Sequence, residues 1–407
     1  MRSITTAQLA VDGGMPVRRA VFPGWPRFAE QEIAVVGEVL RSGLVNYWTG
    51  SHGRAFEREY AAAVGVAHGV AVANGTLALE LALRAVGVGA GDEVLVPSRT
   101  FVASATCVIA VGARPVFVDV DRDSGNLTTG TVRPAIGPRT RAVIAVHLGG
   151  WPVDMDPLLS VARTHGLAVV EDCAQAHGAG YDGRPVGGLG DVAAWSFCQD
   201  KILTTAGEGG MVTTDNPAIW RAVWAYKDHG KDPDILATPH HGSGFRWVHT
   251  SFGSNARMHE LAAAVGRAVL PDLPSWVERR RENAAALAKR LSELPSLRVP
   301  IPDGETLEAS FYRLYAYLNP QRLRAGWSRD RIVEAVRAEG VPCAVGSCGE
   351  VYLERAFGLD LRPPARLPVA RELGETSLAF LVHPTIDLSD MADVADAVEK
   401  VLAVATA

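Results

Sequence analysis

The sequence has no long apolar run, no excess of basic charge and few cysteines, and each absence excludes a class of protein. No stretch reaches the roughly 18 consecutive apolar residues that a membrane-spanning helix needs, and the first residues lack the apolar segment of a secretion signal. Lys and Arg number 40 against 45 Asp and Glu, a net charge of −5, which excludes nucleic-acid binding through a basic field. We therefore expect no nucleic-acid or membrane partner.

The five cysteines form no C-x-x-C pair and are odd in number, which predicts a reduced, cytoplasmic protein. Cys343 and Cys348 lack the second pair of ligands that would favour a metal site. The stretch 227–258 shows no periodicity, and a loop this long in a compact chain is usually functional. The irregular spacing of its histidines favours solvated positions over metal ligands, so we expect no metal; they are His229, His240, His241 and His249.

With 407 residues, the chain is long enough for a large domain and a smaller one. Residues 1–30 are irregular and contain several prolines, which predicts an arm laid over the rest of the chain or over a partner. Residues 31–275 are predicted to form a large α/β domain. Residues 276–407 combine helical spacing with one apolar run, which predicts a smaller α+β domain.

Short apolar runs alternate with helix-like segments through the large domain. This alternation predicts a mostly parallel sheet of seven strands with helices on both faces. In such a sheet, ligands bind at the carboxyl ends of the strands. The runs are 69–73, 93–97, 115–120, 141–147, 167–172, 193–197 and 210–213.

The segment 191–211 places Lys201 between buried strands and beside a glycine-rich turn. Such surroundings disfavour an ammonium ion and favour a lysine that acts as a nucleophile or forms a Schiff base. Ser196 lies five residues earlier, and Asp172 ends another apolar run. A lysine, a carboxylate and a hydroxyl at strand ends indicate a pyridoxal phosphate site. The alternative is a solvated turn lysine.

Asp172 is expensive to bury unless a positive group pairs with it, and a protonated pyridine nitrogen would supply that charge. Gln175 is placed to hydrogen-bond the ring hydroxyl. His177 either supports Asp172 or fills space. Phe101, after another strand, either stacks on the pyridine ring or packs in the core.

Asn74-Gly75-Thr76 joins an apolar run to a helical segment. Backbone N–H groups and the helix dipole favour an anion such as a phosphate at this kind of junction. The alternative is that Thr76 only caps the helix. Asn255, just before the helical segment that starts at Met258, occupies another position that favours an anion.

Five motifs, taken together and in this order, resemble the DegT/DnrJ/EryC1/StrS aminotransferases. They are N-G-T, P-S-R-T-F, E-D-C-A-Q-A-H-G-A, S-F-x-x-x-K followed by E-G-G, and G-x-N-x-R-M-x-E-L-x-A-A-x-G. The resemblance extends from about residue 27 to the C-terminus. It implies a pyridoxal-phosphate enzyme of fold type I that transfers an amino group from glutamate or glutamine to a keto sugar, most often one linked to a nucleotide, in sugar or natural-product biosynthesis.

The resemblance also implies a role for each matching residue. Lys201 matches the Schiff-base lysine, and Asp172 matches the aspartate on the pyridine nitrogen. Asn255 matches an asparagine that reaches the phosphate from the neighbouring subunit, which implies a homodimer with shared active sites. The remaining matches are Gln175 near the ring oxygen, Phe101 stacked on the ring, and Gly75, Thr76 and Ser196 on the phosphate.

Two departures from the family pattern bear on the substrate. His147-Leu148-Gly149-Gly150 stands where the family often has H-L-Y-G, and Cys198-Gln199-Asp200 fills the lysine loop.

A keto cyclitol is the second candidate substrate. Two further functions stay open at this point: a dehydratase, which in some relatives has histidine for Lys201, and a non-catalytic member of the family. Candidate substrate-lining residues are Tyr47, Trp48, Arg246, Tyr312 and His383.

Overall fold

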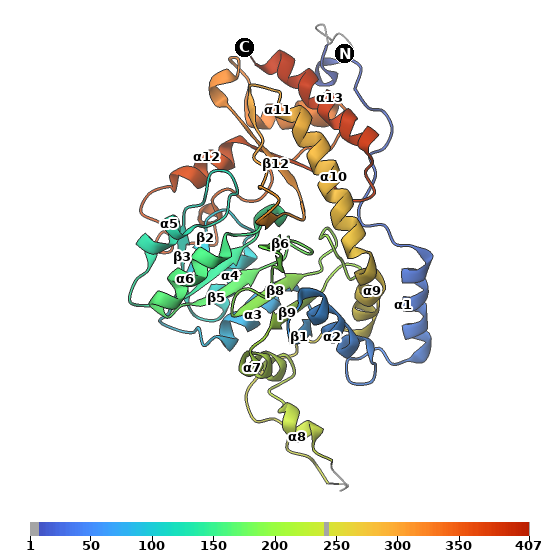
Figure 1. The fold of residues 1–407 in the computed structure, drawn as a ribbon, viewed down its shortest axis with the longest axis vertical. Helices are drawn as coiled ribbons and strands as arrows, with labels where there is room; N and C mark the ends of the chain where they lie inside the picture. Colours follow the sequence, from blue (N-terminus) through green and yellow to red (C-terminus); the bar gives the residue numbers. More distant parts are fainter. Residues whose placement is uncertain (1–7, 240–243, 407) are drawn as a thin grey trace.

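A computed structural model describes residues 8–239 and 244–406. A large α/β part carries a seven-stranded sheet, and a smaller part built from the end of the chain lies against one end of it (Figure 1). None of the helices in the described part combines the length and apolar character that a bilayer crossing needs. His240 and His241 lie outside the described residues.

The predicted seven-stranded, mostly parallel sheet is confirmed. The pairs β2–β3, β2–β4, β4–β5 and β5–β8 are parallel, and β9 runs antiparallel to both of its neighbours. Each predicted apolar run coincides with one strand, shifted by at most two residues at either end. In spatial order the strands are β1 (His68–Val72), β9 (Gly210–Thr214), β8 (Val192–Ser196), β5 (Ala168–Asp172), β4 (Thr140–Val146), β2 (Glu93–Pro97) and β3 (Arg114–Val118).

Helices cover both faces of the sheet because side chains alternate along each strand. In β4, Ala142 and Ile144 pack on one face while Val143 and Ala145 pack on the other. The first face is covered by α3 (Gly75–Ala85), α4 (Ala103–Ala110) and α7 (Pro217–Lys227). The second is covered by α2 (His52–Val64), α5 (Thr129–Val132), α6 (Met155–His165) and α9 (Glu260–Val269), with α1 (Glu30–Ser42) packed on α9.

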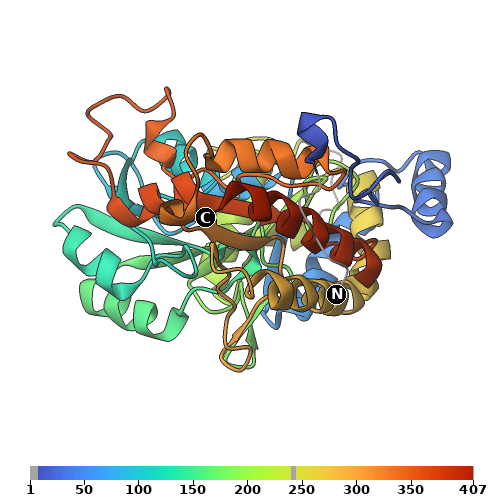
Figure 2. The same cartoon turned by 90° about the horizontal axis from the view of Figure 1, so that it is seen from above.

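The smaller part has its own apolar core around a second, antiparallel sheet of three strands. Leu9 of the N-terminal arm enters this core, and Arg18 pairs with Asp390 at 2.6 Å. Seen from above, the last helix lies across the top of the molecule (Figure 2). The elements are β10 (Leu297–Arg298), β12 (Leu314–Leu318), β13 (Ser377–Phe380), α10 (Leu273–Leu291), α11 (Arg329–Ala338) and α13 (Leu388–Ala405), and the predicted boundary at 275/276 falls inside α10.

The stretch 227–258 is less irregular than its sequence suggests. It contains a short helix, α8 (Pro233–Ala237), which projects away from the α/β body (Figure 1). Asp232 caps this helix and Pro233 occupies its first position, where proline is favoured. The remaining elements are α12 (Pro368–Thr376), β6 (Gly180–Tyr181), β7 (Arg184–Pro185), β11 (Leu307–Glu308) and the 3-10 turns η1 (Ala10–Asp12), η2 (Arg133–Ala135), η3 (Leu148–Gly150), η4 (Leu270–Asp272), η5 (Pro320–Arg322) and η6 (Val351–Leu353).

The stability of the sheet is tested by shortening Ile144, which is fully buried in the middle of β4. We expect Ile144→Ala to lower the free energy of unfolding by about 2–5 kcal/mol because it leaves a cavity in a close-packed core. Denaturant unfolding measures the loss. Ile33→Ala on α1, where the side chain is 56 % exposed, is the matched control, and an equal loss in both variants would contradict the assigned core.

Candidate active site

A cavity of about 740 Å³ lies where the carboxyl ends of the parallel strands meet the smaller part. The loops after β1, β2, β5 and β8 form most of its wall. The smaller part completes the wall with residues at the start of β12, among them Tyr312, Arg313 and Tyr315. Eight of the predicted site residues therefore come together, although they are spread over most of the chain. They are Gly75, Thr76, Phe101, Asp172, Gln175, Ser196, Lys201 and Tyr312.

The start of α3 forms one end of the cavity. Asn74 caps the helix by accepting a hydrogen bond from the Leu77 N–H at 2.9 Å. Gly75 packs so closely on Ser196 that a Cβ atom at this position would lie 2.6 Å from the Ser196 Cβ. Glycine thus lets a helix N-terminus, with its free N–H groups, reach the cavity beside two hydroxyls, those of Thr76 and Ser196. These groups fit a phosphate.

Asp172 lies at the floor of the cavity and is 6 % exposed. Its carboxylate accepts hydrogen bonds from the Ser104 hydroxyl at 2.8 Å and from the Ala174 N–H at 3.1 Å. Thr100 in turn contacts the Ser104 hydroxyl at 2.7 Å. Burial raises the pKa of Asp172 above its ordinary value, against the opposing hydrogen bond from Ser104. A buried carboxylate held only by neutral donors suits a cationic ligand group.

His177 supports Ser196 rather than Asp172. Its Nε2 contacts the Ser196 carbonyl at 2.9 Å, so this nitrogen donates, and its Nδ1 accepts from the Tyr60 hydroxyl at 2.7 Å. Complete burial lowers the pKa of His177 to about 3. The ring is therefore neutral at ordinary pH and fixes the backbone of Ser196.

Glu171 points to the opposite face of the sheet from Asp172. Its carboxylate accepts N–H groups from Gly187, Leu189 and Gly190 at 2.7–2.8 Å and contacts His147 Nε2 at 3.1 Å. His147, Glu171 and Cys173 lie close enough together to resemble a metal-ligand set. These hydrogen bonds already use the carboxylate and the histidine ring, which identifies Glu171 as a structural anchor for the loop after β7.

Gln175 is oriented by the chain turn after β4. Its amide oxygen accepts the Gly149 N–H at 2.7 Å, which leaves the NH₂ group as a donor. Gly149 has a positive φ of 66°, and a Cβ atom here would lie 2.8 Å from the Tyr315 ring. Tyr315, which lines the cavity, thus occupies space beside the position where the family often has an aromatic residue.

The N-terminal arm contacts the backbone of Lys201 through Trp25. The Trp25 indole N–H donates to the Lys201 carbonyl at 2.8 Å. Trp25 itself stacks on His383, with ring centroids 6.1 Å apart, and meets Trp276 edge-on. Lys201 keeps 16 % of its side chain exposed and lies on the cavity wall. Its ammonium group lies 4.9 Å from the centroid of the Tyr312 ring.

The other predicted residues lie outside the cavity of the single chain. Tyr47 is buried and donates to Glu57 at 2.9 Å, and Trp48 packs edge-on against it. Arg246 donates to the Thr238 carbonyl, and His383 lies behind Trp25. Asn255 is exposed.

Sequence patterns missed several residues of the cavity. Thr100 and Ser104 follow β2 in the P-S-R-T-F segment and were detectable as hydroxyls at a strand end. Arg313 and Tyr315 come from the smaller part, and no local pattern links them to β5 or β8. Their position depends on how the two parts pack.

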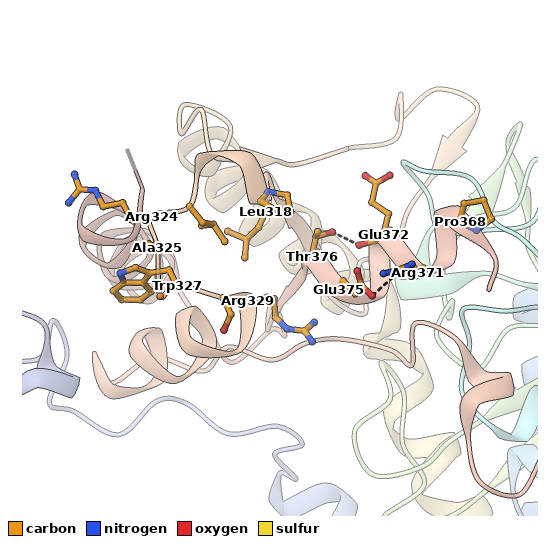
Figure 3. A pocket seen from close by; sticks show the side chains of 14 residues that line it. Leu318, Arg324, Ala325, Trp327, Arg329, Pro368, Arg371, Glu372, Glu375 and Thr376 are labelled. Carbon is orange, nitrogen blue, oxygen red and sulfur yellow. Dashed lines mark hydrogen bonds and ion pairs between the residues drawn. The ribbon is translucent and has the colours of Figure 1, made fainter. Parts of the chain in front are cut away.

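A second cavity of about 580 Å³ lies on the surface of the smaller part (Figure 3). Arg324, Trp327 and Arg329 line one side, and Glu372 and Glu375 line the other. Its acidic and basic groups partly pair with one another, as Arg371 and Glu375 do at 3.0 Å. It lacks the buried carboxylate and lysine of the first cavity.

The buried histidines predict how stability depends on pH. Burial lowers the pKa of both His177 and His383 to about 3, so below pH 6.5 the unfolded chain binds protons that the folded chain does not. Stability should fall as the pH drops, by about 1.4 kcal/mol per pH unit for each ring. Urea unfolding at about pH 7 and pH 5 should show a smaller loss for His177→Gln than for the wild type. His249→Gln, at an exposed position, should leave the loss unchanged; equal losses for all three proteins would contradict the assignment.

Comparison with known proteins identifies the family to which this chain belongs. The profile of the DegT/DnrJ/EryC1/StrS aminotransferase family matches residues 26–399. The UDP-N-acetyl-3-dehydro-alpha-D-glucosamine 3-aminotransferase of Acidithiobacillus ferrooxidans is 36% identical over 90% of this chain and 92% of its own length. The L-glutamine:2-deoxy-scyllo-inosose aminotransferase of Streptoalloteichus tenebrarius is 38% identical over 97% of both chains.

A solved structure shows the same fold. The aminotransferase from Psychrobacter cryohalolentis superimposes with a TM-score of 0.92 at 47% identity, covering 94% of this chain and 99% of its own. The chain therefore belongs to the DegT/DnrJ/EryC1/StrS family, and the protein is an aminotransferase.

Proposed function

We propose that the protein binds pyridoxal 5′-phosphate in the 740 Å³ cavity and moves an amino group from L-glutamate or L-glutamine to a keto sugar. The observation that carries this proposal is the convergence of Lys201, Asp172 and the N-terminus of α3 on one cavity. When bound, the cofactor supplies a ring that withdraws electrons from the carbon that gains or loses the amino group.

Each residue of the cavity has a separate role in this proposal. Asp172 would hold the ring nitrogen and keep it protonated, and the Gln175 NH₂ group would be the donor available to the ring oxygen. The phosphate would be held by Thr76, Ser196 and the first turn of α3. The Lys201 amine would hold the cofactor and, once the donor nitrogen has displaced it, would act as the base that accepts the proton lost by the donor's α-carbon.

The acceptor is a keto sugar, with a nucleotide-linked sugar as first choice. The Acidithiobacillus relative is named for a UDP-linked 3-keto sugar, and its similarity covers nine-tenths of this chain. The Streptoalloteichus relative is named for a keto cyclitol and a glutamine donor, and its similarity covers nearly the whole chain. A keto cyclitol is therefore the second candidate. Lys201 favours transamination over the dehydration expected of relatives with histidine there.

An absorbance spectrum tests the first half of this reaction. Cofactor bound to Lys201 absorbs in the near-violet, and its aminated form absorbs in the near ultraviolet. We expect L-glutamine or L-glutamate to convert one band into the other, and Lys201→Ala to show neither the starting band nor the conversion. Keto sugars and keto cyclitols are then screened for restoring the first band. A wild-type protein that binds no pyridoxal phosphate would overturn the proposal.

We also propose that the active unit is a homodimer in which Asn255 completes the phosphate site of the partner. Asn255 is exposed and lies outside the cavity of its own chain. Large apolar side chains of the same stretch are also exposed: Phe245 by 75 %, Trp247 by 83 % and Phe252 fully. Exposed aromatic groups gathered on one segment favour a surface that a partner covers.

Mixed dimers test the sharing of sites. Lys201→Ala and Asn255→Ala should each be inactive alone, because each damages one half of every site. When the two variants are mixed and allowed to reassociate at random, about half of the dimers contain one copy of each. One of the two sites in such a dimer is intact, so about a quarter of the wild-type sites should be restored. Activity of the mixture, compared with each variant at equal total protein, measures this. No recovery in proven mixed dimers, or full activity of Asn255→Ala alone, would show that sites are not shared.

A further inference from the structure

Two basic side chains line the cavity among the residues that the structure describes, and both contact one carboxylate. They are Lys201 and Arg313. Lys201 Nζ lies 3.8 Å from one oxygen of Asp200, and Arg313 Nη2 lies 3.5 Å from the other. The Tyr312 hydroxyl donates to the same carboxylate. Asp200 thus bridges the reactive lysine and the arginine of the cavity wall.

Asp200 is held in its ionised form. Burial acts to raise its pKa, but Lys201, the Tyr312 hydroxyl and Arg313 together lower the pKa below the ordinary value. Half of its side chain is exposed, whereas Arg313 keeps only 21 % of its side chain exposed. The arginine is therefore largely fixed in place, and the carboxylate is the more open member of the pair.

A third cation gives this corner an excess of positive charge. Arg280 is fully buried, and its Nε and Nη2 have no hydrogen-bond partner among the described residues. Its Nη1 reaches only the Phe311 carbonyl, at 3.4 Å. Burial lowers the pKa of Arg280 to about 9, with Arg313 acting in the same direction and Asp200 opposing it. Of these four side chains, one is acidic and three are basic, so basic groups outnumber the acidic group that they share.

We propose that Arg313 binds the α-carboxylate of the amino donor, and that Asp200 holds this position until the donor arrives. This inference rests on the proposed transamination. A donor whose nitrogen takes the place of the Lys201 amine carries its carboxylate one carbon away. Asp200 lies 3.8 Å from that amine and is therefore within this reach. Arginine binds a carboxylate through two parallel N–H groups, which also fixes its orientation.

Binding of three ligands to the cofactor-loaded enzyme tests the assignment. The probes are L-glutamine, followed by absorbance, 2-methyl-L-glutamine, which lacks the α-hydrogen and is followed by calorimetry, and 4-aminobutanamide, which lacks the α-carboxylate. We expect Arg313→Gln to raise the dissociation constants of the first two by roughly 10- to 100-fold and to leave the third unchanged. Arg313→Lys should give an intermediate loss because it keeps the charge without the fork.

Ligand binding by Asp200→Asn distinguishes the proposed role of Asp200 from a purely structural one, which would not predict tighter binding. The substitution removes the competing charge but leaves an amide oxygen for the Tyr312 hydroxyl, so both carboxylate-bearing probes should bind several-fold more tightly. Arg322→Gln, an exposed arginine of the smaller part outside the cavity, is the matched control and should bind all probes as the wild type does.

The outcomes separate this inference from the function on which it rests. Equal binding of 2-methyl-L-glutamine by wild type and Arg313→Gln, or equal losses for 4-aminobutanamide, would overturn the role of Arg313 while transamination stands. A wild type that binds 2-methyl-L-glutamine through Arg313 but converts no donor would overturn the proposed function and leave the carboxylate site in place.

Discussion

Burial of Asp172 without a cationic partner is the constraint on which the rest of the cavity depends. The strand order places this carboxylate near the centre of the sheet, between β4 and β8, where water cannot reach it freely. Ser104 and the Ala174 N–H satisfy its oxygens with neutral donors. Neutral hydrogen bonds leave the negative charge uncompensated, so the site is built to accept a positive group at this point.

Another corner of the cavity has the reverse imbalance. Lys201 and Arg313 contact the carboxylate of Asp200, and the buried Arg280 is influenced by the same charge. A cavity with a negative floor and a positive corner orients any ligand that carries both charges. The N-terminus of α3, placed by the close contact of Gly75 with Ser196, adds a third point of attachment for an anion. Three such points suffice to fix the orientation of a ligand that carries both charges.

Three separate parts of the chain hold these points in place. The sheet supplies Asp172 and Ser196, the smaller part supplies Tyr312 and Arg313, and the N-terminal arm supplies Trp25, whose indole N–H fixes the Lys201 carbonyl. The arm is itself anchored in the smaller part through Leu9 and through the Arg18–Asp390 pair. The position of the lysine therefore depends on packing between regions far apart in the sequence.

The sequence alone determined the sheet and the part of the site attached to it. Continuous apolar runs define buried parallel strands, and the polar residues that follow them must gather at one edge because parallel strands end there together. Lys201, Asp172, Ser196 and Gly75 were predictable for this reason. Only the tertiary structure brought Arg313 and Tyr315 to the cavity and placed Tyr47 and His383 outside it. Contacts between the arm, the smaller part and the sheet depend on side-chain packing at long range, and such packing leaves no periodic signal in the sequence.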